Sequence, residues 1–156
     1  GANFDGGMGE DHKPETHIIP NAIRSAFSNT QFILYGNDYK TADGTCVRDY
    51  IHVIDLVEAH ILALKLLEKK DGGFLYNVGS GIGYSNKEVV DMVKRVSGID
   101  FKVTIDGRRP GDAEALVADP TKIKQDLGFS PKYSGLQQIV ETAWKWHSNN
   151  PKGYES

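Results

Sequence analysis

The sequence predicts an α/β fold in which strands and helices alternate, so that the strands pair mostly in parallel. Two short apolar segments, residues 32–35 and 74–78, each end just before a glycine, as buried strands often do. Segments with apolar residues at helical spacing are interleaved with them, and one opens with Ser85 and Glu88 in a capping-box pattern. A chain of 156 residues has the size of one domain or of a large part of one.

The beginning of the chain predicts a loop, a helix and a strand. Residues 1–16 are rich in Gly and Asp, contain Pro14 and favour irregular structure. Residues 18–27 have the length and apolar content of a short helix. Residues 32–35 form a compact apolar strand, and the turn-forming stretch after Gly36 contains Asn-Asp and Asp-Gly pairs.

An extended segment and a long helix are predicted next. Residues 47–53 favour extended structure, and Asp55 followed by Glu58 predicts a helix that begins at a capping box. Apolar residues at helical spacing continue to Leu67. Because this helix carries apolar residues on its other faces as well, we expect it to be buried on more than one side.

A glycine-rich segment, residues 79–85, follows the predicted strand 74–78 and precedes a helix that we expect to run to Val96 and to end at Gly98. Glycines in this context bind phosphates in dinucleotide-binding proteins. The glycines stand at positions 79, 81 and 83, which is not the G-x-G-x-x-G spacing. We therefore interpret the segment as a structural turn.

The next elements are a strand, a loop and a short helix. Residues 101–105 predict the strand, and the polar residues 107–112 predict the loop. Asp119 and Pro120 predict the N-cap and the first position of a helix that Gly128 ends.

A final helix is predicted to open at Ser134 and Gln137. Its expected core face consists of Leu136, Ile139, Val140, Ala143 and Trp144. The polar tail, residues 149–156, is expected to fray.

The composition argues against several classes of function. A net charge of −3 with 25% charged residues gives no electrostatic reason to expect nucleic acid as a partner. No apolar run approaches the roughly 20 residues that span a membrane. The single Cys46 excludes an internal disulfide and a multi-cysteine metal site, and it suits a reducing cytoplasm. Since the chain does not start with Met, we expect that Gly1 is not the natural start.

The histidines give no prediction of a metal site. They lack the spacing and the partner residues of zinc ligands, at His12, His52, His60 and His147. His52, which lies in an extended segment, is interpreted as a packing residue.

The arginines are the first candidates for binding chemistry. Arg48 lies in the extended segment, and Arg108 and Arg109 lie in the polar loop with Asp112 close behind. A guanidinium is always charged, and its rigid fork of donors matches phosphate oxygens. Taken alone, however, each arginine is better interpreted as a solvated or salt-bridged surface residue.

Four motifs together resemble a known family: GNDY at 36–39, DGTCVRDYIHV at 43–53, YNVG at 76–79 and RRPGD at 108–112. The chain is similar over nearly its whole length to the NAD-dependent UDP-galactose (UDP-glucose) 4-epimerases of the extended short-chain dehydrogenase/reductase family. The resemblance implies the C-terminal, substrate-binding portion of this Rossmann-type α/β fold. The nucleotide-binding first half is absent, because no segment offers the glycine-rich fingerprint or the Tyr-x-x-x-Lys pair.

The resemblance assigns a role to several residues. It implies that Arg48 and Arg109 hold the diphosphate of a UDP-sugar and that Asp112 bonds a ribose hydroxyl. It also implies that backbone groups at Ile33 meet the uracil and that the ring of Tyr35 lies alongside it. Without the resemblance, an aromatic residue at a strand end would be interpreted as a core residue.

Three further positions carry over. His17 and Ile18 stand where the family has Asn-Leu-Met-Pro, whose first side chain touches a phosphate. Histidine in place of asparagine can titrate near pH 6.5, and its alternative interpretation is a surface residue. Leu116 stands at the position over the sugar, where tyrosine restricts the pocket and a smaller residue admits N-acetyl sugars; leucine is intermediate, and it also fits a half-buried strand.

The implied function is interconversion of UDP-galactose and UDP-glucose by transient oxidation at sugar C4. The NAD cofactor would be bound mainly by the missing first half, with which residues 48–80 are expected to pack. This chain would hold no catalytic residue and no metal, and alone it would be inactive. The full-length protein is expected to be a cytoplasmic homodimer.

Three alternatives stay open. The chain could be a stand-alone UDP-sugar-binding module without chemistry of its own. It could be a structural remnant that folds with a partner. It could also be half of a related UDP-N-acetylhexosamine or UDP-xylose 4-epimerase, since these enzymes share this half.

Overall fold

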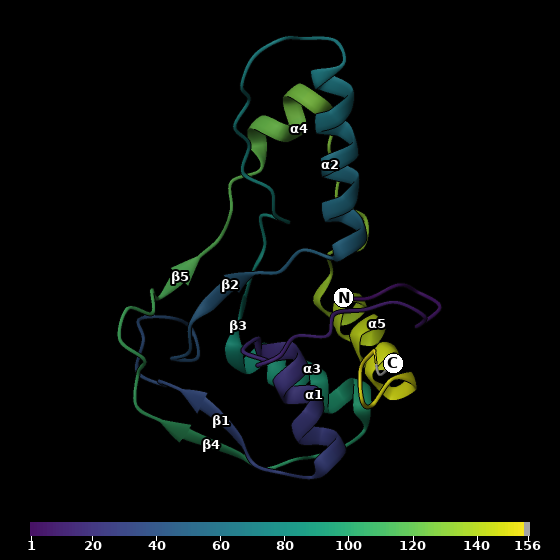
Figure 1. Cartoon of the computed structure of the whole chain (residues 1–156). Coiled ribbons are helices and arrows are strands. Elements are labelled where there is room, and N and C mark those ends of the chain that lie inside the picture. Colours follow the sequence, from purple (N-terminus) through teal and green to yellow (C-terminus); the bar gives the residue numbers. More distant parts are fainter. Residues whose placement is uncertain (155–156) are drawn as a thin grey trace.

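The main core of the protein is built from three helices beside a small sheet (Figure 1). The computed structural model describes residues 1–154. The helices are α1 (Ile18–Ser28), α3 (Asn86–Ser97) and α5 (Leu136–Asn149), which confirms three predicted helices. Their contact is made by apolar side chains that are nearly inaccessible to solvent, including Ala22, Ile23, Val89, Val93, Ile139 and Val140.

The predicted parallel pairing is found in the sheet beside this core. β1 (Phe32–Tyr35) pairs in parallel with β4 (Val103–Asp106), so that Tyr35 lies opposite Asp106. The fourth strand begins two residues later than predicted, and Phe101, which precedes it, is buried in the core. The carboxyl ends of both strands therefore meet at one edge, where loops can bring side chains together.

A second sheet lies above the first in Figure 1. β2 (Val47–Asp49) is its central strand and pairs in parallel with β5 (Ala115–Leu116). On its other side β2 pairs antiparallel with β3 (Gly83–Ser85), a strand that the glycine-rich sequence did not predict. The extended segment predicted for 47–53 is shorter than expected, because a helix begins at Val53.

Helix α2 (Val53–Leu67) begins earlier than predicted. His52 is its N-cap residue, and the His52 Nδ1 accepts a hydrogen bond from the backbone N–H of Ile54 at 3.2 Å. The capping box predicted at Asp55 is therefore wrong. His52 is completely buried, and its Nε2 lies 3.0 Å from the Thr142 hydroxyl, so the predicted packing role is confirmed.

The buried imidazole of His52 predicts a pH-dependent stability. Burial lowers the pKa of His52, while the nearby Asp55 carboxylate opposes this. The unfolded chain, whose histidine pKa is about 6.5, then binds a proton at a higher pH than the folded chain does. The stability that the neutral His52 contributes is therefore present above about pH 6.5 and is lost as the pH falls below this value. Each pH unit costs at most about 1.4 kcal/mol.

Urea unfolding at about pH 7.5 and about pH 5.5 measures this loss, since these values bracket the unfolded histidine pKa. His52→Asn keeps an acceptor for the helix N-terminus but does not titrate. We expect a smaller loss of stability on acidification in this variant than in the wild type. Equal losses in the two proteins would exclude His52 as the cause.

Asp55 serves a tertiary role in place of the predicted cap. Its buried carboxylate accepts hydrogen bonds from the backbone N–H groups of Lys132 at 2.9 Å and Tyr133 at 2.8 Å, and from the hydroxyl of Ser134 at 2.6 Å. Because the Ser134 hydroxyl bonds Asp55, it does not cap α5. Gly135 is the N-cap residue of α5, so the predicted opening of that helix at Ser134 is corrected. Asp55 thus ties α2 to the segment that leads into α5.

Helices α2 and α4 (Thr121–Leu127) stand apart from the main core (Figure 1). They enclose a second, smaller apolar cluster, in which Ala59, Ile123 and Phe129 are buried. Within residues 1–154, no helix combines the length and the apolar character of a membrane span. We use the name arm for the part of the molecule that contains α2 and α4, which consists of residues 53–78 and 121–129.

The start of α4 differs by one residue from the prediction. Pro120 occupies the N-cap and Thr121 is the first helical residue, while the Asp119 carboxylate accepts the Thr121 N–H at 3.0 Å. Gly128 adopts φ 67° directly after the helix, so the predicted end is confirmed.

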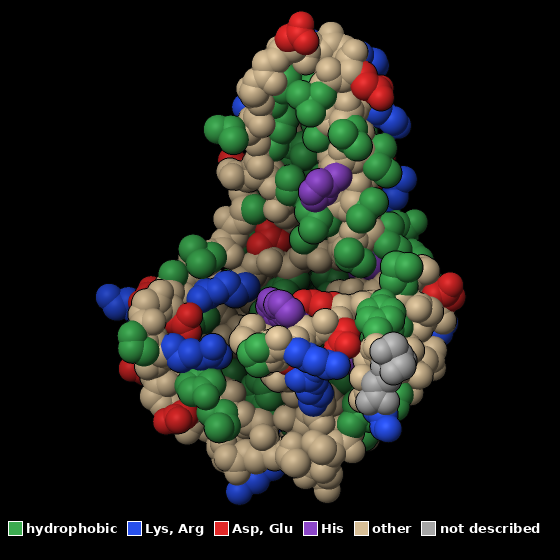
Figure 2. Space-filling view, in the orientation of Figure 1, with side chains coloured by type: hydrophobic (Ala, Val, Ile, Leu, Met, Phe, Trp, Pro, Cys, Tyr) green, Lys and Arg blue, Asp and Glu red, His purple; other side chains and the backbone are tan. Residues whose placement is uncertain are grey.

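Much of the apolar surface of the arm is exposed (Figure 2). The strand predicted for residues 74–78 is absent from the described structure, and Leu75 is 86% exposed. A strand needs a neighbouring strand for its backbone hydrogen bonds, and this segment pairs with no strand in the described part of the chain. The expected burial of α2 on more than one side is also not found, since Val57, Leu64 and Leu67 are exposed.

The tail is attached to the rest of the fold as far as Tyr154, contrary to the expected fraying. The Tyr154 ring lies 4.7 Å from the Trp146 ring, and the Tyr154 hydroxyl donates to the Gly9 carbonyl at 2.9 Å. Trp146 is the buried tryptophan of α5, whereas Trp144 lies half-buried against Phe27. Residues 155–156, also expected to fray, lie outside the described residues.

Candidate functional site

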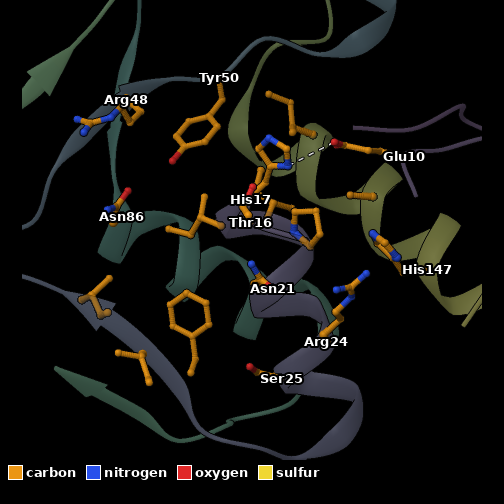
Figure 3. Close-up of a pocket in the computed structure, with 18 of the residues that line it drawn as sticks. Glu10, Thr16, His17, Asn21, Arg24, Ser25, Arg48, Tyr50, Asn86 and His147 are labelled. Atoms are coloured by element: carbon orange, nitrogen blue, oxygen red, sulfur yellow. Dashed lines mark ion pairs between the residues drawn. The ribbon is translucent and has the colours of Figure 1, made fainter. Parts of the chain in front are cut away.

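A cavity of about 780 Å³ lies between α1, β1, β2 and the loop before β5 (Figure 3). It is lined by almost all the candidate residues: His17, Ile18, Ile33, Tyr35, Arg48, Arg109 and Asp112. Leu116 does not line it, because this residue lies on β5 with 58% of its surface exposed. The fold thus brings together segments that are far apart in the sequence.

Arg48 is held in place by the backbone around it. Its Nη1 donates to the carbonyl oxygens of Val47 and Ala113, both at 2.8 Å. Its Nη2 lies 3.7 Å from the carboxylate of Asp112. β2 and the loop before β5 therefore fix the guanidinium next to Asp112, and a fixed fork of donors loses little entropy when it binds an anion.

Arg109 is held differently from its neighbour Arg108. The Arg109 guanidinium lies 4.2 Å over the ring of Tyr35, and no carboxylate in residues 1–154 forms an ion pair with it. Arg108 stacks on Tyr39 and pairs with Asp38 at 2.6 Å, a contact that lowers the pKa of Asp38. Stacking occupies the face of the Arg109 group and leaves its N–H edge available to an anion.

His17 occupies the N-cap position of α1 and contacts Glu15. The His17 Nδ1 is 2.8 Å from the Glu15 Oε1, which also accepts the backbone N–H groups of Thr16 and His17. Burial alone would raise the pKa of Glu15, but these hydrogen bonds lower it. Figure 3 also shows an ion pair between His17 and Glu10.

The sequence reasoning missed several residues of the cavity wall. Tyr50 points into the cavity (Figure 3), and burial raises its pKa to about 12, so its phenol is neutral. Because alternate residues of an extended chain share a face, Tyr50 could have been found from Arg48. Arg24 could likewise have been found from His17, since two turns of α1 place both on one face.

The glycine-rich turn does not fit a dinucleotide phosphate. Asp49 accepts the backbone N–H of Ser80 at 3.0 Å and that of Gly81 at 2.9 Å, and the Ser80 hydroxyl at 2.6 Å. A Cβ atom at Gly79 would lie 2.5 Å from this carboxylate. The N–H groups that a phosphate would need are therefore engaged inside the protein, which confirms the interpretation as a structural turn.

Comparison with known proteins identifies similar chains. The family model described as GDP-mannose 4,6 dehydratase matches residues 3–142. A UDP-glucose 4-epimerase of Lactobacillus helveticus is 51% identical over 99% of this chain. The crystal structure of UDP-glucose 4-epimerase from Bifidobacterium longum in complex with NAD+ and UDP superposes on 99% of this chain with a TM-score of 0.92 and 36% identity.

The chain covers only part of each of these relatives. The chain covers 47% of the Lactobacillus protein and 46% of the Bifidobacterium chain, so it spans about half the length of such relatives. The similarities confirm the resemblance to UDP-glucose 4-epimerases and the α/β fold class, as a portion of the extended short-chain dehydrogenase fold. Since the family model matches most of its residues, the chain belongs to the GDP-mannose 4,6 dehydratase family.

Proposed function

We propose that the cavity binds the UDP part of a UDP-sugar. The observation that carries this proposal is the convergence of Arg48, Arg109 and Asp112, from two separate segments, on one cavity. The two guanidinium groups suit a diphosphate, and the Asp112 carboxylate suits a ribose hydroxyl. Tyr35 and Ile33 line the same cavity and would meet the uracil.

At the other wall, His17 would approach a phosphate from the start of α1, with Ile18 beside it. Leu116 is assigned to the sugar end of the site, beyond the cavity wall that this chain forms alone. A relative from Arabidopsis thaliana, 44% identical over this chain, is named a probable UDP-arabinose 4-epimerase, so similarity over this chain does not by itself identify the sugar.

We further propose that this chain is the C-terminal half of a UDP-glucose 4-epimerase, which interconverts UDP-galactose and UDP-glucose. NAD, held mainly by the first half, would supply transient oxidation at sugar C4. This chain would hold the UDP group while the sugar turns. The name and the partial coverage of the Lactobacillus relative support this proposal.

The partner of the arm in this proposal is the NAD-binding sheet of the first half. Residues 48–80 include the exposed apolar face of α2 and the unpaired segment 74–78. A contiguous apolar surface of this kind is typical of a contact surface, and segment 74–78 could add a strand to a neighbouring sheet.

The resemblance also leads us to propose a homodimer in the cytoplasm, where the buried free thiol of Cys46 would stay reduced.

Arg109→Ala tests the proposed diphosphate contact. In a protein that joins this chain to its proposed first half, we expect UDP binding to weaken by roughly 1.5 to 3 kcal/mol, the usual contribution of a hydrogen bond to a charged group. Isothermal titration calorimetry with UDP measures the change. Arg95→Ala is the matched control, because Arg95 lies on α3, exposed and outside the cavity wall.

The control variant should bind UDP as the wild type does. An unchanged UDP affinity in Arg109→Ala would remove Arg109 from the site. If both variants weakened binding equally, general electrostatic attraction would explain the effect, and the proposed contact would be wrong.

A further inference from the structure

Three side chains that can ligate metals meet at the rim of the cavity, and we call them the rim cluster: Glu10, His12 and His17. The Nδ1 atoms of the two histidines are 3.5 Å apart. The Glu10 Oε1 lies 3.6 Å from the first and 3.4 Å from the second. A tetrahedral zinc ion with bonds of about 2.0 to 2.2 Å holds its ligands about 3.3 to 3.6 Å apart, so these atoms already have the spacing of three corners.

The rim cluster also leaves a fourth corner open. The side chains of Glu10, His12 and His17 are 53%, 55% and 52% exposed, so water or a small ligand can reach an ion between them. Three protein ligands with one open position are typical of zinc sites that exchange a ligand. Two imidazoles and one carboxylate suit zinc better than magnesium or calcium, which prefer oxygen ligands.

A buried carboxylate, that of Glu15, lies next to the rim cluster. The Glu15 side chain is inaccessible to solvent, and its Oε2 atom has no hydrogen-bond partner within residues 1–154. A buried carboxylate oxygen without a partner is costly, and a nearby cation compensates its charge. Glu15 contacts the rim cluster directly, because its Oε1 lies 2.8 Å from the His17 Nδ1.

Ion binding requires two local adjustments. The His17 Nδ1 must exchange its contact with Glu15 for the metal, after which the Glu15 Oε1 still accepts the N–H groups of Thr16 and His17. The two imidazole rings are nearly parallel, at an angle of 8°, so the His12 ring must rotate to aim its lone pair at the same ion. The exposure of His12 leaves room for this rotation.

The geometry points to a zinc-type divalent cation site formed by Glu10, His12 and His17, with its open position beside the cavity. Sequence spacing does not indicate this site, because two of its ligands lie in the N-terminal loop and the third caps α1. A bound cation would add positive charge to a wall that already contains Arg24, and would thereby favour an anionic ligand in the cavity.

Zinc titration of chelator-treated protein tests the proposal directly, with calorimetry for affinity and with Co²⁺ absorption as a probe of tetrahedral coordination. We expect one zinc ion per chain. His12→Ala should weaken zinc binding by at least about 10-fold. Even the loss of a residue that only orients a metal ligand lowers metal affinity by about 10- to 100-fold. His60→Ala is the control, since His60 is an exposed histidine on α2 whose Nδ1 contacts the Leu56 carbonyl.

Circular dichroism shows whether His12→Ala keeps its fold, which we expect for an exposed loop side chain. Glu10→Gln provides a second variant, with the same direction of effect. Absence of zinc binding by the wild type, or equal zinc affinity in His12→Ala and the wild type, would overturn the proposal. A cobalt spectrum without tetrahedral character would overturn it as well.

Discussion

A protein that joins this chain to its proposed first half should interconvert UDP-galactose and UDP-glucose, whereas the 156-residue chain alone should show no turnover. The physical reason is the content of the described site. Its cavity holds two arginines suited to a diphosphate, but its glycine turn is closed by Asp49, so a dinucleotide has no phosphate cradle there. The neutral Tyr50 has no lysine in the cavity wall to lower its pKa, so it is no ready base.

A coupled assay of UDP-glucose formation from UDP-galactose measures this difference. Arg48→Ala in the joined protein should impair use of the substrate without releasing NAD, because Arg48 lines the cavity that we propose for the UDP group. Retained NAD is read from absorbance after gel filtration. Turnover by the chain alone, after removal of any accompanying enzyme, would contradict the proposal that the catalytic residues and most of the NAD site belong to the first half.

Elements with strong local signals could be predicted from the sequence. At the start of α3, the Ser85 hydroxyl accepts the Glu88 N–H at 3.0 Å and the Glu88 carboxylate accepts the Ser85 N–H at 2.6 Å, as the capping-box pattern predicts. Gly98 ends the same helix with φ 71°. Such contacts join residues a few positions apart, so the pattern of residue types determines them.

Contacts between residues far apart in the sequence could not be predicted from such local patterns. Asp55 and Ser134 both have the residue type and position of an N-cap, yet they bond each other across the fold. An Asp or Ser side chain bonds distant backbone groups as readily as its own helix, and sequence spacing does not distinguish the two. The segment 74–78 has strand composition, but a strand forms only where a neighbour supplies hydrogen bonds.

The candidate site was predictable in part, for a related reason. Arg48, Arg109 and Asp112 were found through resemblance, and the spacing of their segments alone would not have brought them to one cavity. The rim cluster was not found at all. Its geometry depends on how the N-terminal loop lies against α1, and loop conformation has no periodic signature in the sequence.

Asp55→Ala should produce a large loss of stability in the arm. The substitution leaves two backbone N–H groups and the Ser134 hydroxyl without their acceptor. The Ser134 contact is buried and the two backbone contacts are partly buried, and an unsatisfied buried group costs about 1 to 3 kcal/mol, so the expected loss is roughly 3 kcal/mol. The effect extends further, because the Ser134 oxygen accepts the backbone N–H of His52 at 3.0 Å, and the lost contact frees this hydroxyl to rotate.

Urea unfolding combined with hydrogen exchange in α2 and α5 measures this loss and locates it. Asp91→Ala is the matched control, since it removes an exposed carboxylate that pairs with Lys87 on α3, and it should change stability by less than about 1 kcal/mol. Asp55→Asn keeps one acceptor oxygen and should fall between the two. If Asp55→Ala matched the Asp91 control, water would have to replace the carboxylate. Water and apolar packing would then hold the arm to α5, and hydrogen exchange in α2 and α5 would stay as slow in Asp55→Ala as in Asp91→Ala.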